Sequence, residues 1–103
     1  MTPDFIIPAG DTPTISGTLT GVTTITGYII TMSAKANITD TSPIFTLTAT
    51  IDNATSGTFH FTPTTTNTNI PENIYNYDIK VIDSSGNILH TQRSVFEITK
   101  AIT

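Results

Sequence analysis

Residues 44–51 read Ile44-Phe45-Thr46-Leu47-Thr48-Ala49-Thr50-Ile51. From Phe45 onward every second side chain is apolar, and each intervening side chain is a threonine. Successive side chains of a β-strand point to opposite faces of the sheet, so this alternation predicts a strand with one apolar face and one hydroxyl-bearing face. Threonine is β-branched and suits the wet face of such a strand.

Similar strand signals flank this run on both sides, roughly one every ten residues. Turn residues separate them, and Asp83-Ser-Ser-Gly-Asn87 is a tight hairpin signal. No helical period lasts two turns, and we interpret the polar stretch 63–69 as a connection between sheets. The pattern therefore predicts strands over residues 4–7, 14–20, 27–36, 44–51, 58–62, 73–82 and 88–99.

About seven strands are typical of an immunoglobulin-like antiparallel β-sandwich, so we expect an all-β fold with a single domain over residues 1–103. Tyr75 or Tyr77, near the start of a long strand, suits the tyrosine corner of such folds. The chain has neither cysteine nor tryptophan, so it is not an antibody-type domain. Alternation predicts four residues buried between the sheets, namely Leu47, Phe59, Tyr77 and Ile79.

Charge and hydropathy argue against several classes of partner. The formal net charge is −4, and the four basic residues are scattered along the chain as Lys35, Lys80, Arg93 and Lys100. A nucleic-acid binder needs a basic stripe, and an anionic membrane would repel this chain, so we expect neither partner. No apolar run approaches the ~20 residues that a transmembrane helix needs, and the N-terminus does not read as a signal peptide.

Several short motifs, taken in order, give the chain a family resemblance. They are Asp4-Phe-Ile-Ile-Pro-Ala-Gly-Asp-Thr12, Ile25-Thr-Gly-Tyr-Ile-Ile30, Ser56-Gly-Thr-Phe-His-Phe61, Ile74-Tyr-Asn-Tyr-Asp-Ile79, Asp83-Ser-Ser-Gly86 and Phe96-Glu-Ile98. The chain resembles small immunoglobulin-like phage proteins related to the N-terminal domain of baseplate upper proteins. That resemblance implies a bacteriophage virion component of the tail, the baseplate or the capsid surface. It also implies synthesis in the host bacterial cytoplasm, with other virion proteins or copies of this chain as partners.

Catalytic and metal-binding constellations are not found in the sequence. His60 and His90 have no His-x-His motif and no nearby carboxylate pair, so we expect solvated strand histidines. Asp83 could offer oxygens to Ca²⁺, but turn chemistry explains it better, because Ca²⁺ needs 6–8 oxygen ligands. No nucleophile motif accompanies the many hydroxyl groups. We therefore expect no enzyme, no metal and no cofactor.

With no catalytic or metal site in the sequence, binding through the shape of the surface is the function that the sequence favours. Ile6 and Ile29 point away from the expected core, and together with Phe5 of the first strand they are the predicted interface residues. A carbohydrate-binding or adhesive module is the alternative interpretation. Sugar-binding sandwiches usually expose aromatic rings for stacking, whereas the tyrosines here are expected to face inward, which favours the structural interpretation.

Overall fold

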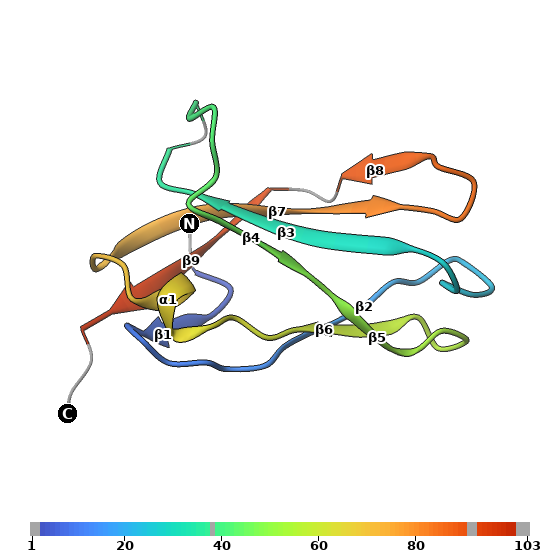
Figure 1. Ribbon diagram of the computed structural model, residues 1–103, viewed down its shortest axis with the longest axis horizontal. Coiled ribbons are helices and arrows are strands. Elements are labelled where there is room, and N and C mark those ends of the chain that lie inside the picture. The colour runs from blue at the N-terminus through green and yellow to red at the C-terminus, as the bar shows by residue number, and fades with distance from the viewer. Residues whose placement is uncertain (1–2, 38, 91–92, 101–103) are drawn as a thin grey trace.

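Two β-sheets build the protein, as the computed structural model in Figure 1 shows. The structure describes residues 3–37, 39–90 and 93–100. The larger sheet has the strand order β1 (Ile6–Pro8), β9 (Ser94–Thr99), β7 (Asn73–Ile82), β3 (Ile29–Lys35) and β4 (Phe45–Thr48), and β8 (Ile88–His90) also pairs with β7. The smaller sheet has the order β2 (Ile15–Thr18), β6 (Thr58–Phe61) and β5 (Thr50–Asn53).

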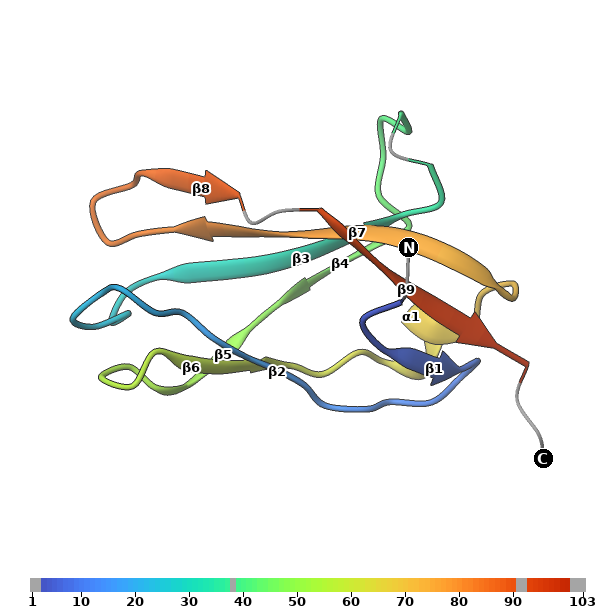
Figure 2. The same cartoon turned by 180° about the vertical axis from the view of Figure 1, so that it is seen from behind.

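The expected all-β sandwich is confirmed by this arrangement. The second, fifth and sixth strands of the chain form one sheet, and the third, fourth, seventh and ninth lie together in the other. This division is the one found in immunoglobulin-like sandwiches. One pairing departs from the antiparallel expectation, because β1 runs parallel to β9, so the larger sheet is mixed (Figure 2).

Two of the expected strands are divided in the structure. The alternating run 44–51 becomes β4 in the larger sheet and β5 in the smaller sheet, because the chain crosses between the sheets near Ala49. The last expected strand, 88–99, becomes β8 and β9, which pair with different parts of β7. The described residues therefore contain nine strands rather than seven. The inward alternation continues from β4 into β5, but it shifts by one residue between β8, where Leu89 faces inward, and β9, where Phe96 and Ile98 do.

The core lies between the two sheets and contains Leu47 and Phe59, as expected. The prediction that Tyr77 and Ile79 are buried is wrong, since both are only partly buried. The smaller sheet has three strands and the larger six, so it cannot cover the whole inner face of the larger sheet. Gly17 leaves room for the Phe59 ring, because an added Cβ would lie 2.7 Å from the ring atom Cζ.

A tyrosine corner closes one end of the sandwich. The Tyr75 hydroxyl donates a hydrogen bond of 2.6 Å to the backbone oxygen of Pro71, four residues upstream, which identifies Tyr75 as the corner residue. The connection before it holds α1 (Thr65–Thr68), a single helical turn within the stretch expected to be irregular. The buried Thr68 hydroxyl donates to the Asp11 backbone oxygen at 2.7 Å, which ties this connection to the β1–β2 segment.

Replacing Tyr75 by phenylalanine should destabilise the protein by about 1 kcal/mol, because a buried hydroxyl hydrogen bond is lost while the ring stays packed. Urea unfolding of the wild type and of Tyr75→Phe measures this change. Tyr28→Phe is the matched control, because no hydrogen bond of the Tyr28 hydroxyl occurs within the described ranges. Equal losses in the two variants would contradict the role given to the corner.

Candidate functional site

Exposed isoleucines lie in two cross-strand rows on the outer face of the larger sheet, one wholly apolar and one with a glutamate between its isoleucines. Residues directly opposite each other on paired strands share a face of the sheet. The register pairs Ile29 with Ile82 and Ile82 with Ile88, so these three residues form a row across β3, β7 and β8, the isoleucine row. Ile29 is 51% exposed and Ile88 is 61% exposed, so most of this row meets solvent.

The second row lies at the opposite end of the same face. Ile6 pairs with Glu97, and Glu97 pairs with Ile74, so the three residues cross β1, β9 and β7 and form the Ile6 row. Ile6 is 60% exposed, and Ile74 is 47% exposed. Ile6 also borders an open groove of about 470 Å³, whose lining is Ile6, Pro8, Gly10, Asp11, Thr12 and Pro13. Ile6 and Ile29 therefore both lie at the surface, but in separate rows.

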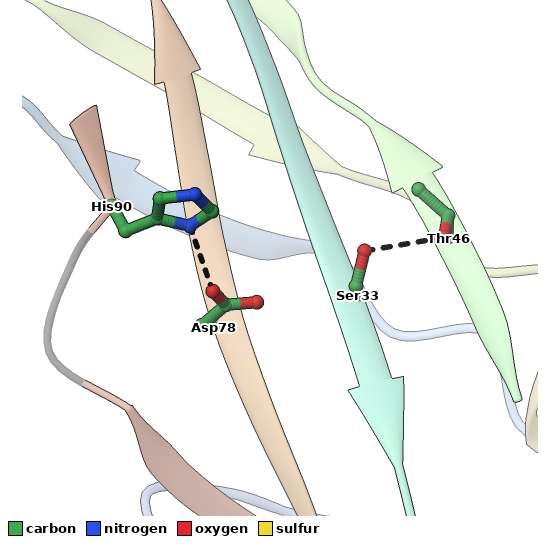
Figure 3. Close-up of polar contacts among 4 residues, drawn as sticks. All are labelled: Ser33, Thr46, Asp78 and His90. Carbon is green, nitrogen blue, oxygen red and sulfur yellow. Dashed lines mark hydrogen bonds and ion pairs between the residues drawn. The ribbon is translucent and has the colours of Figure 1, made fainter. Parts of the chain in front are cut away.

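Polar side chains occupy the face between the two rows. His90 Nδ1 lies 2.9 Å from Asp78 Oδ2, and the Ser33 and Thr46 hydroxyl oxygens are 3.2 Å apart. Figure 3 shows the two pairs on neighbouring strands, with His90 over β7 and Ser33 turned toward β4. The outer face thus has exposed isoleucines at both ends, with Glu97 between those of the Ile6 row, and hydrogen-bonded polar pairs at its centre.

The outer face of the smaller sheet differs, because hydroxyl groups dominate it. Its cross-strand rows pair His60 with both Ser16 and Thr50, and Thr58 with Thr18. His60 Nδ1 lies 2.7 Å from Asp52 Oδ1. Each histidine thus contacts a single aspartate, a partner that the expectation of solvated strand histidines did not include. These pairs join residues 8 and 12 positions apart, so the sequence could show them only through the strand register.

Phe5, the third predicted interface residue, packs within the protein. Its ring stacks on Phe96 with centroids 5.1 Å apart and contacts Tyr77 at 5.4 Å. Beside it the Tyr77 hydroxyl donates to Asp4 Oδ2 at 2.5 Å. Burial and the Asp4 carboxylate raise the pKa of Tyr77 to about 12. Hydrogen bonds from Ser94 and Tyr77 hold the pKa of Asp4 below its usual value. These contacts fix the N-terminal segment on β9.

The described residues show no arrangement suited to metal binding. No group of three or more His, Cys, Asp or Glu side chains gathers among them. Asp83 Oδ1 accepts the backbone N–H groups of Ser85 and Asn87 at 2.9 Å, and these bonds lower the pKa of Asp83. This geometry supports the turn interpretation over the Ca²⁺ interpretation, since turn amides occupy the oxygen.

A sugar-stacking surface is also not visible in the part of the chain that the structure describes. All five phenylalanines and all three tyrosines lie there, and each is buried or half-buried. The Tyr75 and Tyr77 hydroxyls are both engaged within the protein. Among the same residues no helix has the length and apolar character needed to cross a membrane.

No protein-family model matches the chain, and no curated protein matches it significantly in sequence. The site must therefore be interpreted from its own geometry. Sequence reasoning placed Ile6 and Ile29 outward but missed Ile74, Ile82 and Ile88, with which they form rows. The hairpin signal at 83–87 carried the missing information for one row, because it sets Ile82 opposite Ile88.

Tyr77 should make the stability depend on pH in the alkaline range. Its pKa of about 12 in the fold exceeds that of an unfolded tyrosine, about 10. The fold therefore favours the protonated hydroxyl, and this contribution is complete below about pH 10 and is lost as the pH rises toward about 12. Urea unfolding between about pH 9 and pH 12 should show a smaller alkaline loss for Tyr77→Phe than for the wild type. Parallel pH profiles of the two proteins would contradict the Asp4–Tyr77 contact.

Proposed function

We propose that this protein is a non-enzymatic structural component of a bacteriophage particle, held in place through protein–protein interfaces. The observation that carries the proposal is the set of exposed isoleucines in the isoleucine row and the Ile6 row on the outer face of the larger sheet. Ile6, Ile29, Ile74 and Ile88 are each about half exposed or more. Clustered apolar surface of this kind marks interaction sites, whereas single exposed residues are ordinary.

The sequence resemblance to phage immunoglobulin-like domains supports the same proposal, because it assigns such domains to the tail, baseplate or capsid surface. The rows lie at opposite ends of one sheet face, so a single domain could contact two neighbours at once. A subunit that joins its own copies head to tail in a ring or filament uses two different contact surfaces of this kind. Within the particle the partners are other virion proteins, copies of this chain, or both.

Single aspartate substitutions test the proposal directly. Ile6→Asp and Ile29→Asp each place a charge in one row, and burying an unpaired charge in an interface is costly, so incorporation into particles should fall severalfold. Val22→Asp is the control, because Val22 is exposed in the β2–β3 connection and belongs to neither row, so it introduces the same charge outside them. Quantitative mass spectrometry of purified particles measures incorporation.

Far-ultraviolet circular dichroism of each isolated variant should match the wild type, since both residues are exposed. Normal incorporation of Ile6→Asp and Ile29→Asp alike would show that the outer face is not the attachment surface. Absence of the wild-type protein from purified particles would overturn the proposal as a whole.

A further inference from the structure

The strand β8 is an open edge of the larger sheet. It pairs with β7 on one side, and within residues 3–37, 39–90 and 93–100 no strand pairs with its other side. Open edges in natural proteins are commonly protected by proline, charge or a bulge. The edge strand β1 ends at Pro8, whereas β8 contains no proline, and its one titratable residue, His90, lies against Asp78 of β7. The free N–H and C=O groups on such an edge can form a ladder of hydrogen bonds with another extended strand.

Each face of β8 carries an exposed apolar side chain. Ile88 ends the isoleucine row on the outer face. Leu89 lies on the inner face, opposite Val81 and in line with Ile30. Ile30 and Val81 are buried at 1% and 3%, whereas Leu89 is 63% exposed. Figures 1 and 2 show the reason, since β8 lies at the edge of the larger sheet farthest from β5 and β6.

We propose that β8 pairs with β8 of a second copy of this chain, antiparallel about a two-fold axis that passes through Ile88. This inference rests on the proposed function and deepens it by naming the partner of one apolar row. In this register Ile88 lies directly opposite its counterpart, so the two isoleucine rows join into one row across both copies. On the inner face Leu89 lies opposite Asn87 of the second copy, and the two Leu89 side chains are diagonal neighbours within contact range.

Charge favours this contact over other ways of joining two copies. Each copy carries a formal charge of −4, so a contact through uncharged surface brings no further like charges together. The segment 84–89 contains no charged residue, and the proposed register places none opposite a like charge. Nearby, Asp83 is bonded within its own turn and Asp78 lies against His90. The edge of β8 therefore combines a lack of unpaired charge, free backbone groups and exposed apolar side chains. The two-fold arrangement covers these side chains equally in both copies.

Single-cysteine variants test the register, because the chain has no cysteine of its own. Directly opposite residues of an antiparallel pair have Cα atoms about 4.5–5.5 Å apart, which suits a disulfide bond. Diagonal residues lie about 7–8 Å apart, beyond the usual disulfide range. Under mild oxidation Ile88→Cys should form covalent dimers at least about tenfold faster than Leu89→Cys, as judged on non-reducing gels. Val22→Cys serves as the control for random collision.

Sedimentation of the cysteine-free protein supplies a second, independent readout. The wild type and Val22→Lys should show dimers that increase with concentration, whereas Ile88→Lys should remain monomeric at every concentration. A monomeric wild type, or cross-linking of Ile88→Cys no faster than that of Leu89→Cys or Val22→Cys, would overturn the proposal. These measurements use the isolated protein, so their failure leaves the particle test of Ile6→Asp untouched and is distinguishable from failure of the proposed function.

Discussion

The packing of aromatic rings around Phe96 is the interaction on which the larger sheet depends. Phe96 is fully buried on β9, and its ring contacts four others at 5.1 to 6.2 Å, those of Phe5, Phe45, Tyr75 and Tyr77. These rings come from the segment before β1, from β4 and from β7. Aromatic pairs contribute about 0.5–1.5 kcal/mol each beyond the area they bury, so the cluster joins the two ends of the chain to the centre of the sheet.

The width of the two sheets explains the exposed surface. Aromatic and aliphatic side chains of the inner faces fill the space between a six-stranded and a three-stranded sheet. The smaller sheet cannot cover the wider one, and β8 therefore extends beyond it with Leu89 uncovered. On the outer face the isoleucines meet solvent directly, which is an unusual place for so many branched apolar residues. Under the proposed function, contact with other polypeptides provides the cover that the fold itself does not.

The sequence predicted those features that depend on local alternation. It located the long strand 73–82, the inward residues Leu47 and Phe59 and the outward residues Ile6 and Ile29. It could not show that the chain changes sheet near Ala49, because side chains keep alternating through the crossing. The parallel pairing of β1 and the histidine–aspartate pairs depend on which strands become neighbours, and local patterns do not specify this. Buried residues in connections, such as Ile25 and Thr68, belong to no period and so gave no signal.

The proposed function assigns the contacts with other polypeptides to the outer face of the larger sheet. What surrounds that face in a particle can be observed directly. Electron cryomicroscopy of purified particles, at a resolution that separates strands, measures where the domain lies and which face it turns to its neighbours. We expect ordered copies of the domain with the isoleucine row or the Ile6 row covered by another polypeptide. A map in which the domain is present but both rows face solvent would contradict this expectation.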